Sequence, residues 1–184
     1  DQKQHLELTR NIAERFNGIY GQTFKVPDPY IPKVGAKIMS LQDPTRKMSK
    51  SDENVNSYVA LLDKPDDIMR KFKRAITDSD AQVRYGEGKD GINNLMGIYS
   101  VMTGKTNEEI EREFDGRGYG DFKLAVGEAV VDHLRPIQEE FTRLIGDKAY
   151  LEQCYTKSAE TALRISQRTL DKAMKKVGFV KRAF

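Results

Sequence analysis

The residues best suited to chemistry are two lysines three positions apart, Lys47 and Lys50, beside the hydroxyl groups of Ser49 and Ser51. Lysine ammonium groups are point charges that pair with phosphate oxygens, and hydroxyl and backbone N–H groups donate hydrogen bonds to them. The segment contains no glycine, so it is not a Walker-type loop wrapped around phosphates. A mobile loop of this kind suits a reaction in which pyrophosphate leaves, because its lysines can follow the negative charge of the leaving group.

A second segment, residues 86–91, fits the pattern G-x-G-x-x-G of dinucleotide-binding loops. The five residues before it make a poor buried strand, and Glu87 and Asp90 oppose a pyrophosphate. We therefore interpret the segment as a glycine-rich connection before a helix. One cysteine and two histidines argue against a Cys- or His-rich metal site, and we assign no metal-binding residue.

The elements that must position the lysines follow from the spacing of apolar residues. Two short strands are expected, at 24–26 and 35–41, and a polar loop at 42–53 carries the lysines. The rest of the chain favours helices. We expect them at 2–16, from Pro65 to about 76, at 92–102, from Thr106 to Phe114, at 121–145, at 148–155 and at 158–177. A capping box at Thr106 and Glu109 and a stop at Gly178 support two of the boundaries.

Composition and charge narrow the class of protein. The 184 residues fit one ordinary domain or two small ones, and no run approaches the roughly 18 apolar residues of a membrane span, which favours a cytoplasmic protein without membrane contact. The middle of the chain, 52–156, is acidic, which argues against non-specific coating of nucleic acid, whereas 157–184 is basic. Basic groups gather at 70–74 and 172–182, either as solvated helix faces or as contacts for an anion.

A strand-containing beginning followed by helices indicates a mostly α-helical fold. We predict the C-terminal remnant of a Rossmann-like α/β nucleotide-binding domain at 1–58 and an all-helical module at 59–184. The chain opens directly with an amphipathic helix and no strand for it to pack on, so we expect it to be part of a longer polypeptide.

Residues 47–51, Lys-Met-Ser-Lys-Ser, resemble the KMSKS signature of class I aminoacyl-tRNA synthetases. The amino-acid sequence around the signature is similar to that of the bacterial tryptophanyl-tRNA synthetases. The similar segments are 1–5, 32–41, 43–46, 75–79, 83–85 and 91–95. The likeness is strongest over 1–51 and 63–103 and weaker beyond residue 120.

The resemblance implies that ATP and tryptophan form tryptophanyl-adenylate and pyrophosphate, with Mg²⁺, before the aminoacyl group passes to tRNA(Trp). The tryptophan carboxylate is then the nucleophile, and the enzyme positions the reactants and stabilises the leaving charge. On this chain Lys47 and Lys50 would hold the phosphates, and Met48, Ser49 and Ser51 would line the ATP site with them.

Three further site residues are implied by the same resemblance. Asp1 would accept hydrogen bonds from the ribose hydroxyls, Gln2 would contact the polar end of tryptophan, and the backbone of Ile38 would meet the adenine edge. From the residues alone, Asp1 is equally well a helix cap, Gln2 a solvated helix residue and Ile38 a core residue.

The helical part resembles the anticodon-binding module of the family, and we expect its last helix to pack back on the catalytic domain. Our candidates for tRNA backbone contact are Arg70, Lys71, Lys73, Arg74 and Arg84. Membership would also imply a homodimer in the full-length enzyme.

The chain departs from the family in one respect: neither H-x-G-H nor T-x-G-N, the two forms of the second ATP-binding motif, occurs in its 184 residues. We therefore expect half an ATP site and no adenylation by these residues alone. Two alternatives stay open, a non-catalytic helical module that binds tRNA or protein, and a synthetase of tyrosyl specificity.

Overall fold

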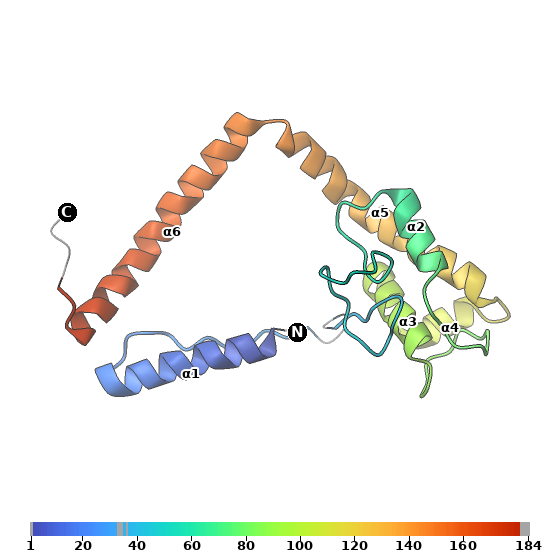
Figure 1. Ribbon diagram of the computed structural model, residues 1–184, viewed down its shortest axis with the longest axis horizontal. Helices are drawn as coiled ribbons and strands as arrows, with labels where there is room; N and C mark the ends of the chain where they lie inside the picture. Colours follow the sequence, from blue (N-terminus) through green and yellow to red (C-terminus); the bar gives the residue numbers. More distant parts are fainter. Residues whose placement is uncertain (1, 33–34, 36, 181–184) are drawn as a thin grey trace. The chain divides into compact units, whose positions relative to one another are not determined.

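A computed structural model describes residues 2–32, 35 and 37–180 of the chain. This part is mostly α-helical, which confirms the predicted fold class (Figure 1). The helices are α1 Lys3–Tyr20, α2 Pro65–Lys73, α3 Asp90–Thr103, α4 Asn107–Glu113, α5 Tyr119–Ile145 and α6 Lys148–Val177. The chain divides into two compact units, residues 32–142 and residues 1–31 with 143–184, and each is described by itself. The domain boundary that we expected after residue 58 lies within unit 32–142 and stays a prediction.

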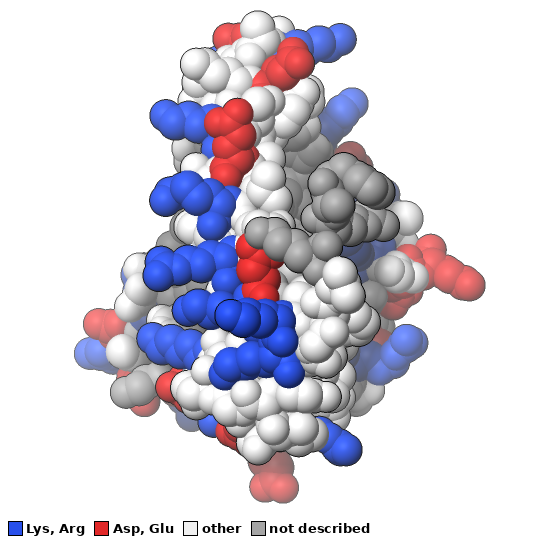
Figure 2. Space-filling view, turned by 90° about the vertical axis from the view of Figure 1, so that its left-hand side faces the viewer, with Lys and Arg blue, Asp and Glu red and all other residues white. Residues whose placement is uncertain are grey.

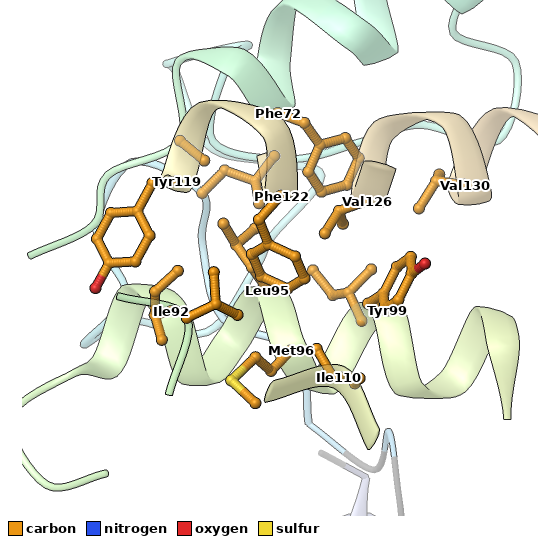
Figure 3. Packing of buried hydrophobic residues seen from close by; sticks show 14 of the residues in the cluster. Phe72, Ile92, Leu95, Met96, Tyr99, Ile110, Tyr119, Phe122, Val126 and Val130 are labelled. Carbon is orange, nitrogen blue, oxygen red and sulfur yellow. The ribbon is translucent and has the colours of Figure 1, made fainter. Parts of the chain in front are cut away.

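The hydrophobic core of unit 32–142 is built from buried side chains of α2, α3, α4 and α5 (Figure 3). The buried residues of α5 include Phe122, Val126, Val130 and Leu134, spaced by four, so they form one stripe along the helix. Each fully buried apolar side chain of this size contributes about 1.5–3 kcal/mol to folding. The segment that carries the two lysines packs against this core.

An aromatic cluster joins three of these elements. The rings of Tyr99 on α3, Phe114 after α4 and Phe122 on α5 meet edge to face, with centroids 4.9–5.8 Å apart. Such pairs contribute beyond their buried area, about 0.5–1.5 kcal/mol each. The cluster fixes α4 and α5 against α3.

Two predicted helix boundaries are confirmed. Thr106 and Glu109 form the capping box of α4: the backbone N–H of Thr106 donates to Glu109 Oε2 at 2.8 Å, and the N–H of Glu109 donates to Thr106 Oγ1 at 3.3 Å. Gly178 ends α6 with a φ of +90°, and its N–H donates to the carbonyl of Met174. Glycine adopts this left-handed conformation without steric cost.

The first helix is longer than predicted, because Asn17-Gly18 does not stop it. The Asn17 side chain instead accepts hydrogen bonds from the N–H groups of Thr23 and Phe24 and donates to the Phe24 carbonyl. It thereby holds the returning chain, and α1 continues to Tyr20. Gly21, with a φ of +76°, follows the last helical residue.

The two predicted strands are wrong for the described residues. The backbone groups of Phe24 are hydrogen-bonded to the side chain of Asn17, as just described, and residues 24–26 form no strand. In 35–41 the ladder is reduced to one antiparallel bridge, between Met39 and Lys47. Residues 33, 34 and 36 lie outside the described chain.

The final helix is also continuous where we predicted a break at 156–157. Helix α6 runs from Lys148 to Val177 without interruption. The predicted break contains neither glycine nor proline, so nothing in the backbone requires the helix to end there.

Candidate functional site

The loop of residues 47–51 leaves the core from a short stem. Met39 and Lys47 pair as an antiparallel bridge, and the N–H of Met48 donates to the carbonyl of Ile38 at 2.9 Å. On the other side of the bridge, the N–H of Ser40 donates to the carbonyl of Arg46 at 2.8 Å. The stem therefore fixes the point at which the first lysine of the loop leaves the protein.

The turn that closes the stem, residues 40–46, is stabilised by hydrogen bonds among its own residues. The buried hydroxyl of Ser40 accepts hydrogen bonds from the N–H groups of Gln42 and Asp43. The Asp43 carboxylate accepts in turn from the hydroxyl of Thr45 at 2.6 Å and from its N–H at 3.1 Å. The hydrogen bond from the Thr45 side chain, and then the one from its N–H, lower the pKa of Asp43. The carboxylate therefore stays ionised, and keeps accepting both bonds, further into the acid range.

Helix α3 clamps the stem from the core side. The side-chain amide of Asn94 accepts a hydrogen bond from the N–H of Met39 at 2.8 Å and donates to the carbonyl of Met39 at 2.9 Å. Asn94 is buried, with 9% of its surface exposed, so these bonds are made away from bulk water. One side chain thus satisfies both backbone groups of the residue that faces Lys47.

Neighbouring segments complete the support. The N–H of Leu41 donates to the carbonyl of Ser57, and the N–H of Ile76 donates to the carbonyl of Leu41. Leu41 is fully buried. The stem is therefore joined both to the end of its own loop and to the segment that follows α2.

Within the loop, one side chain packs toward the core and the others are exposed to solvent. Met48 is half-buried and packs with Ile38 against the core, whereas Lys47, Ser49 and Lys50 are exposed. At the tip, the N–H of Ser51 donates to Ser49 Oγ at 3.3 Å. Two cations and two hydroxyls are thus presented to solvent from an anchored stem, an arrangement that can bind a polyphosphate.

Of the remaining predicted site residues, the structure places Ile38 beside this loop. Asp1 lies outside the described residues. Gln2 belongs to the other compact unit, so its place in the site stays a prediction. The carbonyl of Ile38 is already bonded to Met48, which leaves its N–H as the backbone group for an adenine edge.

Of the five candidates for tRNA contact, Lys71 has a different role. Its ammonium group is buried, lies 2.5 Å from Asp63 Oδ2 and stands over the ring of Tyr58. A buried, paired lysine secures the start of α2 rather than meeting a phosphate, so we withdraw it. The other four are exposed: Arg70, Lys73, Arg74 and Arg84.

Sequence reasoning missed Asn94 as part of the site. The only signal was an asparagine pair, Asn93-Asn94, inside the apolar stripe of α3, because asparagine is a poor helix former and needs partners when buried. No pattern in the sequence indicates that its partner is Met39.

The described part of the chain also bears on two other kinds of site. None of the helices in this part of the chain is long and apolar enough to cross a membrane. The same residues contain no group of three or more His, Cys, Asp or Glu side chains placed to hold a metal ion.

Comparison with known proteins gives a consistent result. Residues 1–135 match the family described as tRNA synthetases class I (W and Y). Tryptophan–tRNA ligase of Wolinella succinogenes is 52% identical over 180 residues, which is 98% of this chain and 55% of that protein. The chain therefore spans about half the length of the curated relatives it matches.

Solved structures give the same relationship. Tryptophanyl-tRNA synthetase from Mycoplasma pneumoniae superposes with a TM-score of 0.88 at 29% identity, over 97% of this chain and 54% of that one. Tyrosyl-tRNA synthetase from Aeropyrum pernix superposes with a TM-score of 0.52 at 26% identity, over 81% and 43%. The tryptophanyl structure is thus the better match of these two.

Proposed function

The chain belongs to the class I tRNA synthetases for tryptophan and tyrosine, and on that premise we propose that it is part of a tryptophan–tRNA ligase. The intact protein would activate tryptophan with ATP in the cytoplasm and transfer it to tRNA(Trp), working as a homodimer. The observation that carries the proposal is the exposed pair Lys47 and Lys50 on a loop whose stem is fixed to the core.

In the proposed reaction, the tryptophan carboxylate attacks the α-phosphorus of ATP. A new P–O bond forms as the bond to the bridging oxygen breaks, and pyrophosphate leaves with that electron pair. Negative charge grows on the leaving group, and Lys47 and Lys50 stabilise it because their ammonium groups can approach its oxygens. Mg²⁺ is proposed as the ion bound to the same phosphates. No side chain of this chain needs to act as a nucleophile.

The anchored stem explains how a mobile tip could act at a defined place. Because Asn94 and the bridge hold Met39 and Lys47, the tip can move while its origin stays fixed. Positioning of this kind lowers the entropic cost of bringing the cations to the phosphates.

Removal of both loop charges in the intact protein tests the proposal. We expect the double variant Lys47→Gln/Lys50→Gln to reduce kcat for tryptophan-dependent ATP–pyrophosphate exchange by about a hundredfold or more, because losing even one preorganised charge-stabilising group has an effect of that size. The matched control, Lys25→Gln/Lys64→Gln, removes two exposed lysines elsewhere and should exchange at the parental rate. Exchange at that rate in the loop variant would refute the proposal.

For tRNA we propose that Arg70, Lys73, Arg74 and Arg84 contact the backbone phosphates. Reversing the charges at 70, 73 and 74 should weaken tRNA binding and spare tryptophan activation, because phosphate contacts do not take part in adenylate formation. Equal loss of both activities would contradict this assignment.

A further inference from the structure

Helix α6 carries a row of positive charges that the site above does not use. We define its basic face as the exposed residues Lys157, Arg164, Arg168, Lys172 and Lys175. They follow one another at intervals of seven, four, four and three, so their side chains project from one side of the helix. Figure 2 shows Lys and Arg side chains stacked in such a column. At 1.5 Å per residue the row is about 27 Å long.

The opposite side of α6 is apolar. Leu163, Leu170 and Val177 lie about half a helical turn away from the basic face, and Ala173, on the same side as these, is the buried residue of the helix. Any neighbour that covers this apolar side leaves the basic face directed away from it. The basic face is therefore a surface of the protein whatever covers the apolar side.

The charges of the basic face are available to a partner. Among the described residues, no carboxylate forms an ion pair with Arg164, Arg168 or Lys172, and the surface is hollowed between these three. Asp171, at the edge of the row, accepts a hydrogen bond from Gln167 at 2.7 Å. A row of unpaired cations complements a line of negative charges rather than a single ion.

We infer that the basic face of α6 binds the phosphate backbone of the tRNA that the intact protein aminoacylates, an inference that rests on the proposed function. Cations along about 27 Å can follow several successive phosphates of one strand, and such contacts orient an RNA without selecting its sequence. This surface is separate in the chain from Arg70 and Lys73 of α2, which we propose for the same partner.

A lipid surface is the competing partner for a basic amphipathic helix, but it would have to take up the apolar side as well. That side is already engaged at its C-terminal end, where Ala173 is buried. Close by, the Lys176 ammonium group donates to the carbonyls of Gly21 and Gln22 at 2.9 and 3.0 Å. These contacts favour RNA over a membrane.

The test is made in the full-length protein that contains this chain. The triple variant Arg164→Gln/Arg168→Gln/Lys172→Gln should weaken binding of a tRNA(Trp) transcript by about tenfold or more near physiological salt. The slope of log K against log salt concentration should fall by about two, since each lost phosphate contact removes about 0.7–0.9. Tryptophan-dependent ATP–pyrophosphate exchange should stay at the parental rate, because the basic face takes no part in activation.

Two controls separate charge from folding. The variant Arg164→Lys/Arg168→Lys keeps the positive charges and should keep the affinity. The variant Arg112→Gln/Arg135→Gln/Lys148→Gln removes three charges away from the basic face and should change the salt slope little. Helicity of every variant is checked by circular dichroism.

Several outcomes would overturn the inference. Unchanged tRNA affinity and salt slope in the triple variant would do so, and so would an equal loss in the three-charge control. Binding of phosphatidylserine vesicles that depends on Arg164, Arg168 and Lys172, without any effect on tRNA, would assign the face to a membrane instead. Failure of the proposed function is a separate result, since it is seen as a parental protein that does not exchange pyrophosphate with tryptophan.

Discussion

Asn93 and Asn94 are adjacent on α3, and each uses its side-chain amide to hold both backbone groups of one other residue. Asn94 holds Met39 in the stem of the lysine loop, and Asn93 accepts from the N–H of Gly86 and donates to its carbonyl at 3.0 and 2.7 Å. The two residues therefore make the same kind of clamp at two different places. This pair allows loop positioning to be separated from stability.

We expect Asn94→Ala and Asn93→Ala each to lower the free energy of unfolding by about 2 kcal/mol, because each loses two hydrogen bonds of about 1 kcal/mol. Only Asn94→Ala should also lower kcat for pyrophosphate exchange in the intact protein, since only its partner faces Lys47. Urea denaturation and exchange kinetics measure the two effects. If both variants lost kcat equally, Asn94 would have no specific role in placing the loop.

Tyr119 and Asp78 form a second polar pair whose strength depends on pH. The Tyr119 hydroxyl donates to Asp78 Oδ1 at 2.6 Å. Burial and this neighbouring carboxylate raise the pKa of Tyr119 to about 12. Burial opposes ionisation of Asp78, but the hydrogen bonds from Tyr119 and from the N–H of Asp80 outweigh it and lower the pKa of Asp78. The folded state thus favours a neutral tyrosine beside a charged carboxylate.

Replacing Tyr119 by phenylalanine should cost about 1–2 kcal/mol of stability at pH 7, the contribution of a hydrogen bond to a charged group at a partly exposed site. Because the pKa of Tyr119 is raised on folding, its contribution is present below pH 10 and is lost as pH rises through 12. Because the pKa of Asp78 is lowered, its contribution is lost as pH falls below its ordinary value of 3.8. Denaturation across this range should show the difference between parent and Tyr119→Phe shrinking at both ends; a constant difference would contradict the assignment.

At the scale of elements, two glycines of α3 differ in the space that a side chain would have. A Cβ on Gly91 would collide with the backbone carbonyl of Ile76 and lie 2.9 Å from Thr77 Cα, whereas a Cβ on Gly97 would meet nothing within 4 Å. The start of α3 therefore packs directly on the backbone of 76–77, and residue 97 faces open space.

Substitution of glycine by alanine should consequently change the free energy of unfolding in opposite directions at the two sites. Gly91→Ala should lower the free energy of unfolding by about 1–3 kcal/mol, because backbone cannot move aside as a side chain can. Gly97→Ala should raise it by up to about 1 kcal/mol through helix propensity. Urea titration of both variants measures the pair, and equal effects would disprove the close approach at Gly91.

The elements differ in how well the sequence predicted them, for a physical reason. The capping box of α4 and the glycine stop of α6 involve residues within a few positions, so local patterns identify them. The strand at 24–26 failed because Asn17 takes the backbone groups that a sheet would use. The loop signature at 47–51 was visible, but its clamp is 55 residues from Met39 and rests on tertiary packing that no periodicity records.

At the scale of the whole molecule, the chain carries one part of the proposed ATP site. The loop with Lys47 and Lys50 belongs to unit 32–142. The second phosphate-binding motif of the family is absent from the 184 residues, which cover about half the length of the relatives. Positioning dominates catalysis of phosphoryl and nucleotidyl transfer, so half a site should give far less than half the activity.

A polypeptide of only these 184 residues should therefore show no tryptophan-dependent ATP–pyrophosphate exchange above background. The lysines could still attract phosphates. Without the second phosphate-binding motif, however, the α-phosphorus and the tryptophan carboxylate would not be held in line. Exchange assays on this polypeptide and on the parental protein, with circular dichroism to verify helicity, make the comparison. Exchange by the shorter chain at the parental rate would mean that the loop and its clamp suffice for activation, and the interpretation of these residues as a partial site would have to be abandoned.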